Sequence, residues 1–205
     1  MTMSNNIIEE YRKPIKHGEA VLRIHQDFDP HDPREMYDHN TVMVCWHSRY
    51  DLGDKHDFSE PDDFIEFIEG EPGGVYLPLY LYDHSGITMS VGRFSCPWDS
   101  GQVGYIYTTD AHLVSMGHGG VHPIPDHDTL LTWLRQDVEE YDNYLTGEVY
   151  GFTYHEEIRV NPAGDIEERN EDSCYGFNYS NWDEMILGML EHCEANPTLE
   201  EWVCQ

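Results

Sequence analysis

The sequence predicts an α+β fold, with one domain built mainly on an antiparallel sheet and with two main helices. Apolar runs of strand length arrive in pairs around turn-forming residues, which is typical of hairpins. Helical periodicity is clearest in residues 129–144 and in a later segment that begins at Asn181 or Asp183 and ends at His192. The 205 residues show no shift in composition that would divide them, so we expect a single domain over residues 1–205.

The first third of the chain predicts few regular elements. We expect a loosely ordered N-terminal segment over residues 1–18, followed by a strand within residues 20–28. Residues 29–33 contain two prolines and read as a loop. A compact apolar run at residues 42–46 predicts a second strand. A short helix is then expected from Pro61 to Gly70, because proline favours the first helical position and glycine favours the end.

The predicted core sheet comes from residues 73–109, which hold only three charged residues in a chain that is 25% charged. Residues 76–82 and 87–91 flank four turn-forming residues and predict a hairpin. Residues 102–109 alternate in the manner of a third strand. We expect these three neighbours in sequence to form a meander.

The second half predicts a long helix and a second hairpin. Leucine, valine and tyrosine residues recur at spacings of three and four over residues 129–144, with Asp128 as the expected N-cap and Gly147 beyond the end. Residues 149–160 and 165–169 flank a turn that contains proline and glycine, and they predict a hairpin.

The net charge of −29, from 40 acidic and 11 basic residues, excludes binding to nucleic-acid phosphates or anionic membranes. Two interpretations fit this acidity. The first is a surface adapted to molar salt, and the second is mimicry of a DNA backbone. Successive quarters of the chain hold 8, 11, 8 and 13 acidic residues, which is nearly even. Mimicry needs a concentrated stripe, so the even distribution favours a halophilic surface.

Cysteine usage and the apolar runs suggest a cytoplasmic protein. The five cysteines are an odd number without a CxxC pair, which argues against a disulfide framework or a zinc knuckle. Residues 1–10 lack the features of a signal peptide, and no uncharged apolar run approaches 18 residues. No glycine-rich phosphate loop follows an expected strand, and we expect no cofactor.

Three motifs carry a family resemblance. PWDSGQVGYIY at residues 97–107, YDNYLTGEVYGF at residues 141–152 and DSCYGF at residues 172–177 resemble an uncharacterised family of proteins from tailed viruses, mobile elements and their prokaryotic hosts. The resemblance spans roughly residues 76–180. It implies a viral or accessory origin, and it implies no activity.

The first of these motifs also contains the candidate catalytic residues. Cys96 is a possible nucleophile, Asp99 a possible catalytic carboxylate, and His84 or His47 a base that would stabilise the thiolate. The alternative is structural, with Cys96 packed as a small apolar residue and Asp99 accepting backbone N–H groups in a turn next to Trp98.

The candidate metal ligands are His118, His122 and Asp126, in a loop rich in histidine and glycine. Nitrogen and carboxylate ligands would suit zinc or manganese, whereas the alternative is an exposed loop without a metal. Because loops at strand ends gather polar residues, we expect Cys96 and Asp99 to lie at the end of the central sheet beside this loop.

These observations favour a non-enzymatic accessory or interaction protein of viral or mobile-element type, acting on a protein partner in the cytoplasm of a halophile. One alternative is an acidic DNA-mimic that inhibits a host defence or DNA-processing enzyme. The other is a small hydrolase that uses Cys96 or a metal site.

Overall fold

The fold is α+β with antiparallel sheets, as the sequence predicts. The structure is a computed structural model that describes residues 7–179, 181–193 and 198–205. Within these ranges it has five α-helices, one 3-10 helix and nine strands in two antiparallel sheets. Contacts divide the chain into two compact units: unit 1 comprises residues 1–30 and 147–205, and unit 2 comprises residues 31–146. The expectation of one domain over residues 1–205 stays a prediction, and each unit is described by itself.

Unit 2 is built on a four-stranded sheet. Its strands are β3 (Val42–Cys45), β4 (Val75–Asp83), β5 (Ile87–Ser90) and β6 (Ser100–Thr108), in the spatial order β3-β6-β4-β5. The β4–β5 hairpin is confirmed. The meander is wrong, because β6 pairs with the other edge of β4 and with β3. The connection at 91–99 is long enough to carry the chain across to that edge.

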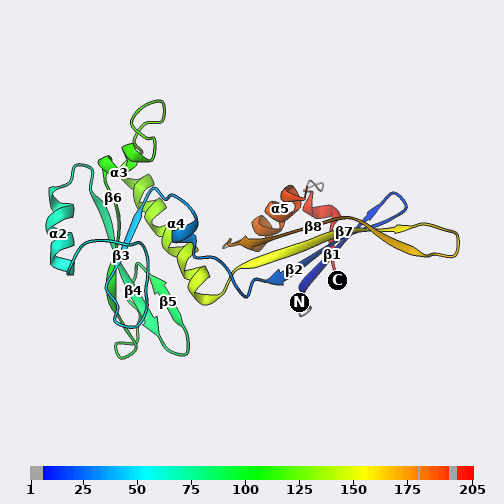
Figure 1. Cartoon of the computed structure of the whole chain (residues 1–205), viewed down its shortest axis with the longest axis horizontal. Helices are drawn as coiled ribbons and strands as arrows, with labels where there is room; N and C mark the ends of the chain where they lie inside the picture. The colour runs from blue at the N-terminus through cyan, green and yellow to red at the C-terminus, as the bar shows by residue number, and fades with distance from the viewer. Residues whose placement is uncertain (1–6, 180, 194–197) are drawn as a thin grey trace. The chain divides into compact units, whose positions relative to one another are not determined.

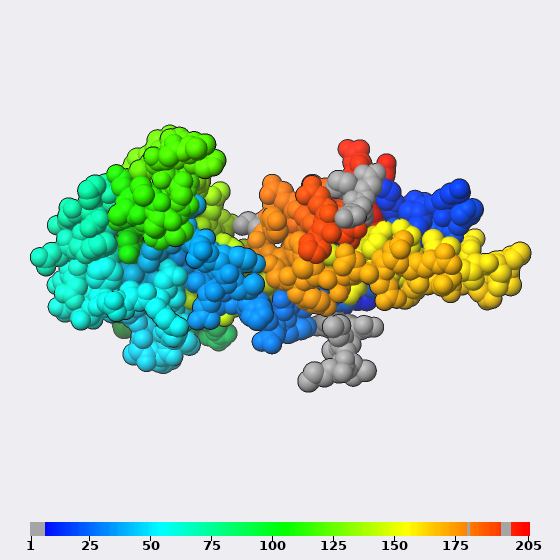
Figure 2. Space-filling model, turned by 45° about the horizontal axis from the view of Figure 1, so that its top comes forward, coloured from blue at the N-terminus to red at the C-terminus, as the bar shows by residue number. Residues whose placement is uncertain are grey.

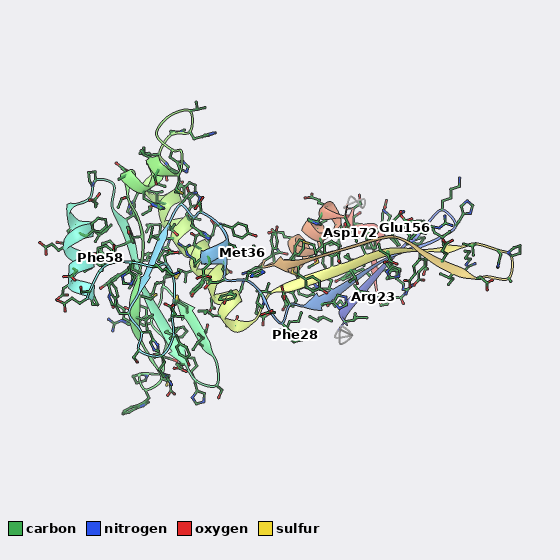
Figure 3. All side chains as sticks on the ribbon, in the orientation of Figure 1. Arg23, Phe28, Met36, Phe58, Glu156 and Asp172 are labelled. Carbon is green, nitrogen blue, oxygen red and sulfur yellow. The ribbon has the colours of Figure 1, made fainter. Side chains whose placement is uncertain are left out.

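Two helices cover opposite faces of this sheet (Figure 1). They are α2 (Pro61–Gly70) and α4 (His127–Thr146). Side chains alternate along a strand, so Met43 packs in the core beneath α4, and its neighbour Val44 packs against Phe64 of α2. Phe58 lies beside α2 (Figure 3), with its ring 5.6 Å from that of Phe64. Each face of the sheet therefore has its own apolar core.

The helix ends follow the local sequence signals, with one correction. The expected helix from Pro61 to Gly70 is confirmed. The long helix begins at His127, and the Asp126 carboxylate accepts a hydrogen bond from the backbone N–H of Thr129 at 2.8 Å. Asp126 therefore caps α4, and the expectation that Asp128 does so is wrong. The short helices α1 (Pro33–Met36) and α3 (Asp110–Ser115) complete unit 2.

Unit 1 is built on a five-stranded sheet in the order β8-β7-β2-β1-β9. Its strands are β1 (Ile7–Ile15), β2 (Gly18–Gln26), β7 (Tyr150–Arg159), β8 (Ile166–Phe177) and β9 (Val203–Cys204). The second hairpin, β7–β8, is confirmed. The loosely ordered segment over residues 1–18 is wrong for residues 7–18, because β1 pairs along its length with β2. Residues 1–6 lie outside the described residues.

Helix α5 (Trp182–His192) covers one face of this sheet (Figure 1). The sequence left Asn181 and Asp183 open as the cap of this helix, and the structure shows that Asn181 caps it. Met185, Met189 and Leu190 of α5 pack in one core with Leu22 and Phe152. The opposite face is polar: Arg23, on β2 (Figure 3), bonds Glu10 of β1 at 2.7 Å. A short 3-10 helix, η1 (Leu199–Glu201), precedes β9. In the part of the chain that the structure describes, no helix has the length and apolar character needed to cross a membrane.

Candidate functional site

Antiparallel pairing brings three segments of unit 2 to one end of its sheet. The last residues of β4 pair with the first residues of β6, with Tyr82 opposite Ser100. The turn after β4, which contains His84, therefore meets the residues that precede β6. The end of β3 also meets the start of β6, because the N–H of Trp46 donates to the carbonyl of Val103 at 2.8 Å.

The three catalytic candidates converge here on one carboxylate oxygen. The Sγ atom of Cys96 lies 3.5 Å from Oδ2 of Asp99, and Nδ1 of His84 lies 3.4 Å from the same oxygen. The backbone supports this turn, because the N–H of Asp83 donates to the carbonyl of Asp99 and the Ser100 hydroxyl donates to the carbonyl of Cys96. Sequence reasoning named these three residues as candidates, and the pairing of β4 with β6 is the reason that they meet.

The order of the three groups does not suit a cysteine nucleophile. Such a nucleophile needs an imidazole that takes up the thiol proton. In this turn the thiol donates instead to the carboxylate of Asp99, and the ring of His84 faces that same carboxylate. The side chain of His84 is 63% exposed and that of Asp99 is 39% exposed, so water screens their interaction. Asp99 thus contacts a thiol and an imidazole through its carboxylate, whereas the structural alternative expected that carboxylate to accept backbone N–H groups.

An open pocket of about 550 Å³ lies beside this turn. Trp46, Arg49, Asp83, Trp98 and Asp99 are among its lining residues. The exposed fraction of Trp98 is 90%. We call these five residues the Trp98 surface. It combines two indole rings with charges of both signs.

Arg49 is the cation of the Trp98 surface. Its guanidinium forms an ion pair with Asp83 and lies 5.4 Å from the ring centre of Tyr50. That ring stacks on His47 at 5.0 Å. The Arg49 side chain is 65% exposed, so the guanidinium is within reach of a bound molecule. Sequence reasoning missed Arg49, because its ion-pair partner, Asp83, is distant in the sequence.

The candidate metal ligands lie at the other end of β6. The chain enters β6 from Asp99 and leaves it toward α3 and the loop of His118, so the expectation that Cys96 and Asp99 lie beside this loop is wrong. His118 and His122 form an isolated bridge, and Nε2 of His118 lies 3.1 Å from the Asn40 side-chain oxygen. Asp126 is used as the cap of α4. Among the described residues, these three are in neither of the two groups whose ligand atoms converge within 4.8 Å.

One of those two groups is His39, Asp137 and Glu140, and it belongs to a network around the buried Arg34. The guanidinium of Arg34 bonds Asp54 at 2.5 Å and Asp137 at 3.3 Å. Burial alone would raise the pKa of Asp137, but hydrogen bonds from His39 and Thr41 and the charge of Arg34 lower it. The carboxylate is thus already used within the fold, and this network is structural. The second group, His155 with Glu157 and Glu168, lies in unit 1.

Comparisons with protein-family models, with curated proteins and with solved structures find no match to this chain.

Proposed function

We propose that this chain is a non-enzymatic accessory protein of viral or mobile-element type, which binds a protein partner through the Trp98 surface in the cytoplasm of a halophile. The observation that carries the proposal is the indole of Trp98, which is 90% exposed at the rim of a pocket. Exposing an indole costs free energy in water, and tryptophan is among the residues that contribute most to binding at protein interfaces.

The chemistry of the Trp98 surface suits binding in concentrated salt. Ion pairs on an exposed surface weaken as salt rises, whereas burial of apolar area does not. The Trp98 surface pairs the apolar area of its indoles with one cation, Arg49, and two carboxylates, Asp83 and Asp99, in a chain of net charge −29. Arg49 adds a planar cation that can stack on an aromatic ring of the partner.

The acidic residues support the halophilic part of the proposal. No Asp or Glu among the described residues is buried, so the carboxylates stay in contact with water. Among the described strands, β8 has the highest density of acidic residues, and on this strand Arg169 interrupts the row and bonds Glu167 at 2.6 Å. This interruption favours a solvated surface over an uninterrupted imitation of phosphates.

The proposal is tested by capture of partners at molar KCl. The tagged wild-type chain and the variants Trp98→Ala and Val121→Ala are each incubated with host lysate in 2–3 M KCl. Val121 is a matched control, because it lies in the same unit and its exposed fraction is 94%. We expect Trp98→Ala to weaken capture of one specific protein about tenfold or more, and Val121→Ala to leave it unchanged. Equal capture of that protein by Trp98→Ala and Val121→Ala would contradict the proposal.

A second variant separates binding from catalysis. Cys96→Ser removes the thiol of the candidate nucleophile and keeps a group of similar size. We expect capture by this variant to equal that of the wild type. The wild type and Cys96→Ser are also tested on a panel of ester, thioester and peptide substrates. If the wild type hydrolyses one of them and Cys96→Ser does not, the result would support the hydrolase alternative.

The salt adaptation has its own test. The Debye length falls from about 30 Å at 0.01 M to about 3 Å at 1 M salt, so repulsion among the carboxylates is long-ranged only in dilute buffer. Thermal unfolding followed by circular dichroism is expected to show a midpoint that rises steeply toward molar KCl. A midpoint that stays flat would remove the halophilic part of the proposal.

A further inference from the structure

The polar face of the unit 1 sheet contains a histidine that is buried without a hydrogen-bond partner at one ring nitrogen. His155 lies on β7 and is 5% exposed. Its Nε2 atom is buried and accepts or donates no hydrogen bond among the described residues. A buried polar atom without a partner carries a free-energy cost, so it calls for an explanation.

Two carboxylates face this nitrogen. Nε2 of His155 lies 3.5 Å from Oε1 of Glu157 and 3.8 Å from Oε1 of Glu168. All three candidate ligand atoms lie within 4.8 Å of one another. We propose that His155, Glu157 and Glu168 form a binding site for one divalent transition-metal ion, with zinc as its best occupant.

Strand geometry explains why these three side chains converge. Tyr154 packs in the core beneath α5, so alternation places His155 and Glu157 together on the opposite face. Glu168 is the direct partner of Glu157 in the β7–β8 ladder. Each ligand therefore comes from a fixed position on paired backbone, and the site links the two strands. Figure 2 shows this hairpin as a yellow and orange surface.

The distances suit zinc. A tetrahedral zinc ion with ligand bonds of about 2.0–2.1 Å separates its nitrogen and oxygen ligands by roughly 3.3 Å. The two measured separations from Nε2 exceed this value by only a few tenths of an ångström, so small side-chain rotations bring the ligands into position. One imidazole with two carboxylates favours zinc or manganese over magnesium, which prefers oxygen ligands and water.

The surroundings of the site hold one ligand in place. Arg12 donates hydrogen bonds to both carboxylate oxygens of Glu157, at 2.9 Å to Oε2 and at 3.4 Å to Oε1, and Oε1 also lies 3.5 Å from Nε2 of His155. Arg12 also bonds Glu10 and Glu19, and these two carboxylates offset its positive charge. Hydrogen-bonded outer partners of this kind orient the ligands of protein metal sites.

The experiment measures zinc binding to the chelator-treated full chain by calorimetry, with magnesium as a comparison. We expect one zinc ion per chain, a dissociation constant below about 10 µM, and binding of magnesium at least tenfold weaker. His155→Gln and Glu168→Gln should each weaken zinc binding at least tenfold. Zinc should also raise the unfolding midpoint of the wild type by roughly 5 °C at saturation, and that rise should disappear in both variants.

Matched controls distinguish a built site from general attraction to a negative chain. Glu167→Gln removes the same charge from the neighbouring position of β8, whose side chain points to the other face. His39→Gln removes the histidine of the other convergent group. Both controls should bind zinc as the wild type does. Folding of Glu168→Gln is not in question, because its side chain is 56% exposed.

Three results would overturn the proposal. The first is a wild-type chain that binds no zinc at 100 µM. The second is equal weakening by Glu167→Gln and Glu168→Gln, which would show attraction by charge alone. The third is a loss of zinc binding in His39→Gln and its retention in His155→Gln. Each result is independent of partner capture by Trp98, which is in unit 2.

Discussion

Replacing Arg34 by methionine is the sharpest test of how unit 2 is held together. The Arg34 side chain is 2% exposed, and its guanidinium bonds both oxygens of Asp54, the carbonyl of Thr41 and a carboxylate oxygen of Asp137. These partners come from different segments of the chain. Methionine keeps much of the apolar volume, and it removes every one of these bonds.

The expected loss follows from the exposure of the partners. Removing one member of a buried ion pair costs about 3–5 kcal/mol, because the other charge stays behind without compensation. Here the side chains of Asp54 and Asp137 are 21% and 20% exposed, so water compensates them in part. We therefore expect a loss near the lower limit, about 3 kcal/mol, which corresponds to a fall in the unfolding midpoint of about 6–12 °C.

Urea unfolding followed by circular dichroism measures this loss, and Arg49→Met is the matched control. Arg49 also forms an ion pair with an aspartate in unit 2, but its side chain is 65% exposed. An exposed pair contributes about 0–1 kcal/mol, so the same substitution should be nearly neutral there. If Arg34→Met cost less than about 1 kcal/mol, or no more than Arg49→Met, the reasoning from burial would be refuted.

Three further predictions concern packing, protonation and capping. Gly104→Ala should cost about 1–3 kcal/mol in urea unfolding, because its Cβ would lie 2.0 Å from a backbone oxygen of β3, whereas Gly101→Ala in the same strand meets nothing within 4 Å and should be neutral. The hydrogen bond to Asp137 raises the pKa of His39 above 6.5, so its stabilisation is complete below that pH and is lost as the pH rises through the raised pKa. The difference in urea midpoint between wild type and His39→Gln should therefore be larger at pH 5.5 than at pH 9, and an equal difference would contradict the assignment. Asn181→Ala should cost about 1 kcal/mol, because its side chain accepts from two N–H groups at the start of α5, and an unchanged thermal midpoint would show that the cap is unimportant.

The elements that sequence reasoning found are those with local signals. Pro61 and Gly70 mark the limits of α2, because each favours its position through its own backbone geometry. Turn-forming residues mark both hairpins in the same way. Strand β1 was missed because its sequence, IIEEYRKPI, alternates poorly. Its charged residues are satisfied by partners such as Glu157, which only the folded sheet brings near.

The candidate sites depend on which distant segments pair in the sheets, and the sequence predicts these pairings less well than it predicts single elements. The convergence of Cys96, Asp99 and His84 depends on the pairing of β4 with β6, whereas the expected meander would have placed β6 beside β5. The same pairing sends the loop of His118 to the opposite end of the sheet. His155 carried a usable signal, since it alternates with Glu157 on a predicted strand of a predicted hairpin. Only the register, which sets Glu168 opposite Glu157, lay beyond the sequence.

The placement of the few basic residues connects the charge of the chain to both proposals. With 11 lysines and arginines against 40 acidic residues, each arginine can bring several carboxylates together, and Arg12 contacts three of them. Salt weakens such pairs, but it also relaxes repulsion among the far larger number of carboxylates that remain, so its net effect should stabilise the fold. A zinc ion bound by His155, Glu157 and Glu168 would add two positive charges to the β7–β8 hairpin and would likewise reduce repulsion among the carboxylates. A partner that buries the exposed indole of Trp98 would be held mainly through apolar area, so we expect it to stay bound at salt concentrations that dissociate contacts made by charge alone.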